Sequence, residues 1–111
     1  MITEEVLAEL SSEHPHRTTV VLFGIEAHVC ILQTALDLLD LGYTVLIVAD
    51  AVSSIRYQDR LVGITRAQQE GTKITTSESI IFELIKHVQS KHFKPLMPII
   101  RDVAKDLMAH L

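Results

Sequence analysis

Short uncharged runs of apolar residues alternate with longer amphipathic stretches along the chain. Residues 20–23 and 43–48 are apolar or β-prone throughout. Gly24 follows the first run, and Ala49 and Asp50 follow the second. Runs of this length and composition are typical of strands that are buried on both faces of a parallel sheet. A shorter β-prone segment follows at residues 73–76. The pattern therefore predicts strands near residues 19–23, 44–48 and 73–75.

Between these runs, apolar residues recur every three or four positions, which is the spacing of one helix face. Thr3 followed by two glutamates suits the start of a helix, and Gly42 suits a C-cap. In the helix before the third strand, we expect Leu61, Val62 and Thr65 to face inward. The predicted helices cover residues 3–10, 31–41, 58–69, 77–90 and 99–108.

The order of these elements predicts the fold class. Helices alternate with strands along the chain, and this alternation favours parallel strands joined by right-handed crossovers. We therefore expect an α/β protein, specifically a three-layer α/β/α Rossmann-like sandwich with a parallel sheet. The three predicted strands are fewer than the roughly four to six that sheets usually have.

Composition narrows the class of protein. The chain has 111 residues, 48% of them hydrophobic, and a formal net charge of −4, which indicates one ordinary globular domain. The acidic balance argues against nucleic acid as a partner, and no apolar stretch is long enough for a membrane span. A lone cysteine is typical of a reducing compartment, and the acidic amino terminus is unlike a signal peptide. We therefore expect a cytoplasmic protein with neither a membrane nor a nucleic-acid partner.

The segment from Gly24 to Cys30 is the most informative one for chemistry. It follows the first predicted strand and leads into a helix, and ligands of open α/β sheets bind at the carboxyl ends of the strands. Cys30 is expected in the first helical turn, where free backbone N–H groups favour a nucleophilic thiolate and can stabilise an oxyanion. The alternative is an inert buried thiol, which is the commoner state of a lone cysteine.

Other polar residues are expected to be structural. His14 and His16 lie in a polar loop without the further ligands that a metal site needs, so no metal is expected there. Arg56, Arg60 and Arg66 are expected on a solvated helix face.

Three motifs follow one another along the chain. They are Gly-x-Glu-x-x-x-Cys at residues 24–30, Ala-Asp-Ala at residues 49–51 and Thr-Ser-Glu at residues 76–78. Together they resemble the nucleophile region of the isochorismatase-like cysteine hydrolases, most of all the animal-type isochorismatase domain-containing proteins. The resemblance implies a six-stranded, largely parallel sheet with helices on both faces. Residues 1–111 would form the carboxyl-terminal part of this domain, with strands four to six.

The resemblance also implies a reaction and a site. Amidase members of the family cleave C–N bonds of small-molecule substrates without a cofactor, through a cysteine that forms a thioester, and Cys30 matches this nucleophile. A cis peptide is implied at Ile25-Glu26, and the backbone N–H groups of Glu26 and Cys30 would then point at a shared oxyanion. The candidates for the pocket are Ile25, Ala27, His28 and Asp50.

Two catalytic partners that the family implies do not precede the cysteine here. In the family an aspartate and a lysine come earlier in the chain, whereas the first Asp is Asp37 and the first Lys is Lys73. We therefore expect the isolated chain to be inactive, as a truncated isoform, a partial gene model or the product of a split gene. The alternative is a non-catalytic interaction module that pairs with itself as a homo-oligomer, or with a full-length or complementary chain. Residues 20–23 are expected on an exposed sheet edge, because the neighbouring strand of the family fold would be missing.

Overall fold

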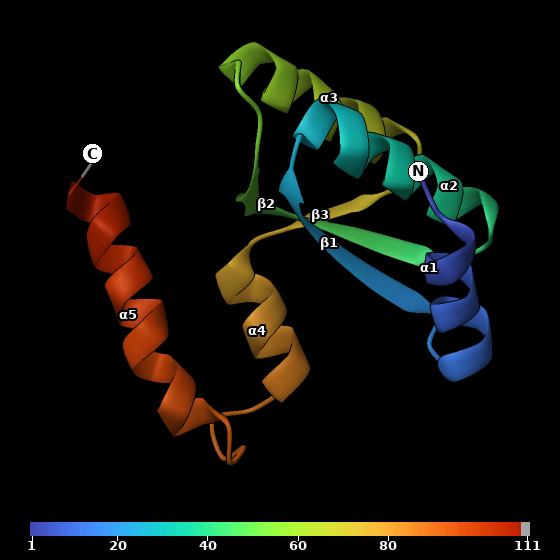
Figure 1. The fold of residues 1–111 in the computed structure, drawn as a ribbon. Helices are drawn as coiled ribbons and strands as arrows, with labels where there is room; N and C mark the ends of the chain where they lie inside the picture. The colour runs from blue at the N-terminus through green and yellow to red at the C-terminus, as the bar shows by residue number, and fades with distance from the viewer. Residues whose placement is uncertain (110–111) are drawn as a thin grey trace. The chain divides into compact units, whose positions relative to one another are not determined.

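The computed structural model describes residues 1–109 (Figure 1). The chain forms two compact units, Met1–Ser77 and the residues from Glu78 onward. The first unit contains a three-stranded sheet with helices, and the second contains helices only. The chain is therefore an α/β protein, as the order of the elements predicted.

The sheet is parallel and has the order β1-β2-β3. Its strands are β1 (Thr19–Ile25), β2 (Thr44–Ser53) and β3 (Lys73–Thr75), so all predicted strands are confirmed. β2 continues past its predicted end, and its register against β1 shifts, because Leu22 pairs with Ile47 whereas Gly24 pairs with Val52. The residues of β2 between these two pairs form an irregular segment at the carboxyl end of the sheet.

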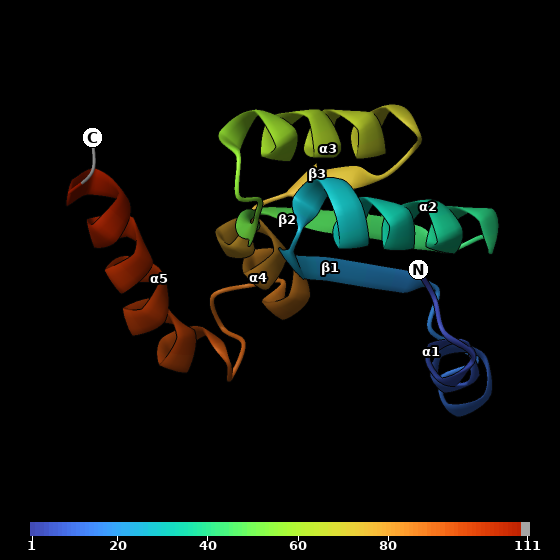
Figure 2. The ribbon, with the colours of Figure 1, turned by 45° about the horizontal axis from the view of Figure 1, so that its top comes forward.

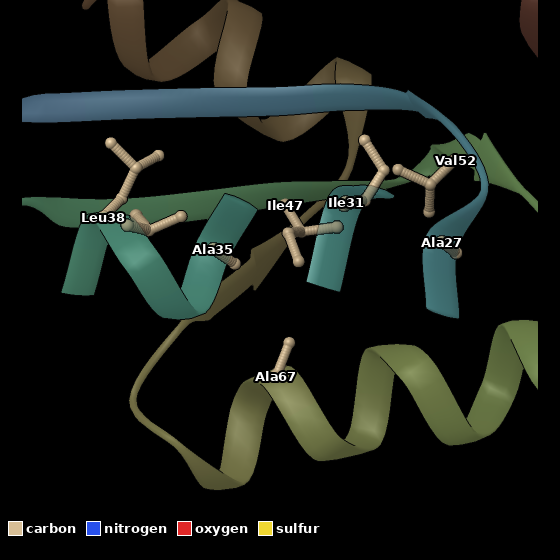
Figure 3. Close-up of a cluster of buried hydrophobic side chains, with 8 residues drawn as sticks. Ala27, Ile31, Ala35, Leu38, Ile47, Val52 and Ala67 are labelled. Carbon is tan, nitrogen blue, oxygen red and sulfur yellow. The ribbon is translucent and has the colours of Figure 1, made fainter. Parts of the chain in front are cut away.

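Two helices cover one face of this sheet, α2 (Leu32–Asp40) and α3 (Tyr57–Gln69), as Figure 2 shows. The core lies between them and the sheet (Figure 3). Ile47 of β2, Leu38 of α2 and Ala67 of α3 are almost fully buried there. Removing these side chains from water is the main contribution to the stability of this unit.

β1 lies at the edge of the sheet, and one of its two faces is exposed. Its side chains alternate in exposure, and Phe23 and Ile25 are 70% and 68% exposed. The prediction of two-sided burial was wrong because an uncharged apolar run does not reveal whether both faces of a strand are covered. The expectation of an exposed edge, which came from the family resemblance, is confirmed.

The buried face of α3 also differs from the prediction. Gly63 and Ala67 face inward, whereas Leu61 and Val62 are exposed. A Cβ atom on Gly63 would lie 2.7 Å from the Cα of His28. Small residues therefore face inward because the helix approaches the neighbouring backbone too closely for larger ones.

The α-helical part of the amino-terminal helix is shorter than predicted. It comprises α1 (Glu4–Ala8) and then a π-helical segment, η1 (Glu9–Glu13). The predicted helix start is confirmed, because Thr3 Oγ1 accepts a hydrogen bond from the backbone N–H of Val6 at 3.2 Å. The Ser11 hydroxyl donates to the Leu7 carbonyl at 2.7 Å, a contact that disturbs regular helix bonding.

The second unit contains the remaining helices, α4 (Ser77–Ile85) and α5 (Phe93–Ala109). α4 ends earlier than predicted, followed by Lys86 with a φ of 70°. α5 begins earlier than predicted: Pro95 lies in its first turn, where proline is tolerated, and the helix continues through Pro98. Among residues 1–109, no helix is both long and apolar enough to cross a membrane.

Candidate active site

Cys30 lies where the sequence placed it, just after β1 and at the start of a helix. It belongs to a short π-helical segment, η2 (Ala27–Ile31), which leads directly into α2. Its side chain is partly exposed, so it is not a fully buried structural thiol. This position is at the carboxyl ends of the strands, where ligands of parallel sheets bind.

The turn around Cys30 is wider than a regular α-helical turn. The N–H groups of Val29 and Ile31 both donate to the carbonyl oxygen of Glu26, each at 3.1 Å. Cys30 lies between these two donors, in the first turn of the helix, where backbone N–H groups can face a ligand. π-turns of this kind are frequent at functional sites. The expected cis peptide at Ile25-Glu26 is confirmed.

The side chains of Glu26 and His28 contact the loop after β2. Glu26 Oε2 accepts the backbone N–H of Ile55 at 3.1 Å, and His28 Nδ1 lies 2.9 Å from the Ser54 hydroxyl. His28 Nε2 lies 3.7 Å from Asp59 Oδ2. Both ring nitrogens of His28 thus face polar groups of the loop after β2 and of α3.

Asp50 contacts the start of α4. Its Oδ1 accepts the backbone N–H of Ser77 at 2.7 Å, and its Oδ2 accepts the Ser77 hydroxyl. Burial by itself would raise the pKa of the Asp50 carboxyl, but the hydrogen bonds from Ser77 outweigh it, so this pKa lies below its ordinary value of 3.8. Asp50 therefore caps the first residue of α4 through both of its carboxylate oxygens.

We expect Asp50→Ala to lower the free energy of unfolding at pH 7 by about 0.5–2 kcal/mol, the usual effect of losing a capping side chain. The pKa of Asp50 is depressed in the folded state, so its charged form stabilises fully above the unfolded pKa. That contribution is lost as the pH falls through the folded pKa. The difference between wild type and variant should therefore shrink below about pH 4.

Urea unfolding at pH 7 and pH 3 measures this difference. Asp40→Ala is the matched control, because Asp40 is an exposed carboxylate at the end of α2. An equal loss for Asp50→Ala at both pH values would contradict a role for the charge.

Sequence reasoning missed the part that α3 plays at this end of the sheet. Arg60 was expected on a solvated face, but its Nε donates to the Val52 carbonyl at 3.0 Å and its Nη2 donates to the Ala49 carbonyl. These carbonyls belong to the irregular part of β2, where the pairing with β1 shifts. The sequence contained no signal for this contact, because the irregularity in β2 could not be predicted. Arg56 and Arg66 form exposed ion pairs on the helix surface, as expected.

Among the side chains that the structure describes, those of residues 1–102, no group of three or more His, Cys, Asp or Glu is arranged to hold a metal ion. The two arginines at the start of α3 are already engaged, Arg56 with Asp59 and Arg60 with the carbonyls of β2. The site therefore consists of a partly exposed thiol in a first helical turn and a polar network that holds the surrounding loops.

Comparison with known sequences places this arrangement in a family. The family model of the isochorismatase domain matches residues 2–79. Isochorismatase family protein 1B of Dictyostelium discoideum is 46% identical over 98% of this chain and 53% of its own length. Isochorismatase domain-containing protein 2 of Xenopus laevis is 45% identical over 96% of this chain and 51% of its own length. The chain spans about half the length of the curated relatives it matches.

This chain also covers only part of the solved structures with the same fold that it matches. The MAR1 ribonuclease of Caenorhabditis elegans is 40% identical, with a TM-score of 0.77, over 82% of this chain and 47% of that one. A pyrazinamidase/nicotinamidase of Streptococcus mutans UA159 is 30% identical, with a TM-score of 0.55, over 60% of this chain and 37% of that one. This chain thus matches only part of each of these larger proteins.

Proposed function

Because this chain belongs to the isochorismatase domain family, we propose that it provides the nucleophile of a cysteine hydrolase, Cys30, which acts on the C–N bond of a small amide. The observation that supports this most is the place of Cys30, a partly exposed thiol in the first helical turn after β1. A similar solved structure is a pyrazinamidase/nicotinamidase, a name that denotes amide substrates.

In the proposed reaction, the thiolate of Cys30 attacks the carbonyl carbon of the amide. A C–S bond forms, and the π electrons of the carbonyl move onto its oxygen. The oxyanion then collapses, the C–N bond breaks, and the leaving nitrogen takes up a proton to become an amine or ammonia. Water next attacks the thioester, the C–S bond breaks, and the carboxylic acid and the thiol are released.

The backbone would stabilise the oxyanion. We assign this role to the N–H groups of Cys30 and Glu26, since donors fixed by the fold are worth more than water where charge develops. Ile25, Ala27 and His28 belong to the same turn and would border the bound substrate. No cofactor enters these steps.

The proton transfers need a base that this chain does not place before the cysteine. In the family an aspartate and a lysine assist, whereas the carboxylates of Glu26 and Asp50 are held here by the N–H of Ile55 and by Ser77. A general base is typically worth about 10²–10⁴ in rate. We propose that residues 1–111 are the carboxyl-terminal part of one isochorismatase-like domain, and that by themselves they turn over little substrate.

We expect the purified chain to release ammonia from nicotinamide and pyrazinamide no faster than its Cys30→Ala variant, because the base is missing. Iodoacetamide should nevertheless alkylate Cys30 at pH 7 faster than it alkylates glutathione. Ammonia release and mass spectrometry of the alkylated protein measure the two rates, and Cys30 is the single cysteine of the chain.

Two results would count against these assignments. Amide hydrolysis that disappears in Cys30→Ala would show that a substitute base is present. Alkylation no faster than that of glutathione would remove the case for Cys30 as a nucleophile. Circular dichroism of wild type and variant establishes that both are folded alike.

A second candidate function is pairing through the open edge of β1, without catalysis. Among the described residues, β1 pairs with β2 alone and has no charged residue. Unprotected edges of this kind add strands from other chains. We propose a second copy as the partner, and a full-length or complementary chain of the family as the alternative.

We also propose a cytoplasmic location, because a lone free thiol suits a reducing compartment, and no nucleic-acid partner. The proposal of no nucleic-acid partner differs from what the name of the C. elegans ribonuclease suggests. It is based on the net charge of −4 and on the engagement of Arg56, Arg60 and Arg66 in contacts within the chain. Phosphate-binding surfaces need cations that are free to bind.

A further inference from the structure

The loop that follows β2 is held by the segment that contains Cys30. The backbone N–H of Ile55 donates to Glu26 Oε2 at 3.1 Å, and the Ser54 hydroxyl lies 2.9 Å from His28 Nδ1. Glu26 also closes the turn around the cysteine, because its carbonyl oxygen accepts two N–H groups of η2. One residue therefore fixes the cysteine turn through its backbone and the loop through its side chain.

The side chain that this anchored loop presents is apolar and almost free of contacts. Ile55 is 92% exposed although its backbone is hydrogen-bonded. Two further exposed apolar side chains belong to the same region: Ile25, which pairs in register with Ser53, and Val29, which precedes Cys30. An apolar side chain on an anchored backbone can contact a ligand without a further entropic cost of fixing that backbone.

The charged groups beside the loop already have partners. Arg56 Nε lies 2.9 Å from Asp59 Oδ2, and Arg60 donates to two backbone carbonyls of β2. Among the described residues at this end of the sheet, both arginines therefore already have a partner within the chain. An apolar contact such as Ile55 offers a charged substrate group no ion pair, so it favours an uncharged one.

We propose that Ile55 contacts the group bound next to Cys30, that Glu26 is the positioning residue for this contact, and that the substrate is an uncharged amide with an apolar substituent. This inference rests on the proposed role of Cys30 as the nucleophile. Glu26 acts through the backbone of Ile55 and not as the catalytic base, since its carboxylate is occupied by that N–H.

The test compares alkylation of Cys30 by three reagents that differ only in the group next to the reactive carbon: iodoacetamide, N-hexyl iodoacetamide and iodoacetate. Each rate is divided by the rate of the same reagent with glutathione. We expect the normalised rate for the hexyl reagent to exceed that for iodoacetamide about three- to tenfold, since apolar contact favours it. The normalised rate for iodoacetate should be the lowest.

Variants assign the preference to the loop. Ile55→Ser should abolish the preference for the hexyl reagent, whereas Val62→Ser should keep it, because Val62 is a similarly exposed apolar residue on α3. Glu26→Ala should also lose the preference, and Glu26→Gln should keep most of it, because an amide oxygen can still accept the N–H of Ile55. A merely structural role of Glu26 would lower all three rates together.

The outcomes separate this inference from the proposed function. An equal normalised rate for both neutral reagents, or a preference unchanged in Ile55→Ser, would overturn the inference while leaving Cys30 as a nucleophile. A preference that depends on Ile55, in a chain whose Cys30 reacts no faster than glutathione, would support the contact and overturn the nucleophile assignment. Circular dichroism confirms that each variant is folded.

Discussion

Replacing Gly63 by alanine is expected to lower the free energy of unfolding by about 1–3 kcal/mol, the usual cost of inserting an atom into a packed interface. The new Cβ would lie 2.7 Å from the Cα of His28 and 2.9 Å from its backbone nitrogen. These are backbone atoms, which cannot turn away as the end of a side chain can. Helix propensity alone predicts the opposite sign, because alanine is favoured over glycine in a helix by about 1 kcal/mol.

Urea unfolding at neutral pH decides between the two signs. Thr65→Ala is the matched control, since Thr65 lies on the same helix and is exposed, so that only propensity changes. The clash should also displace η2 and alter the alkylation rate of Cys30. Equal or higher stability of Gly63→Ala would show that α3 and η2 are not in the close contact described.

Replacing Phe23 by lysine is expected to raise the dissociation constant of self-association through β1 at least tenfold. Phe23 lies on the exposed face of the edge strand. Burying such a side chain contributes roughly 1.5–3 kcal/mol, and every 1.4 kcal/mol corresponds to a factor of about ten. A lysine also adds the positive charge that natural edge strands use against pairing.

Light scattering and sedimentation over a range of concentrations measure this association. Val62→Lys adds the same charge at an exposed position on α3 and should leave the association unchanged. A wild-type chain that stays monomeric at every concentration, with a cooperative unfolding transition, would refute pairing through β1. Equal effects of both lysine variants would point to net charge and not to the edge.

Much of the candidate site could be predicted from the sequence because its backbone placement is local. The apolar run before Gly24 predicts β1, which continues past its predicted end to Ile25, and the amphipathic stretch after it predicts a helix, so Cys30 had to lie near their junction. The contacts of Glu26 with Ile55 and of His28 with Ser54 are a different case. They join residues far apart in the chain, and no spacing in the sequence indicates them.

The sequence by itself determined the order of the elements, the parallel strands and the position of the cysteine, because these follow from hydrophobic periodicity and from the short range of turn and capping preferences. Contacts between distant segments, which the sequence did not reveal, fix which face of α3 is buried and what Asp50 and Arg60 contact. Leu61 and Val62 were expected inside because they are apolar. Gly63 and Ala67 are inside because α3 approaches η2 and the sheet too closely for larger side chains, and that distance is set by packing between segments distant in sequence.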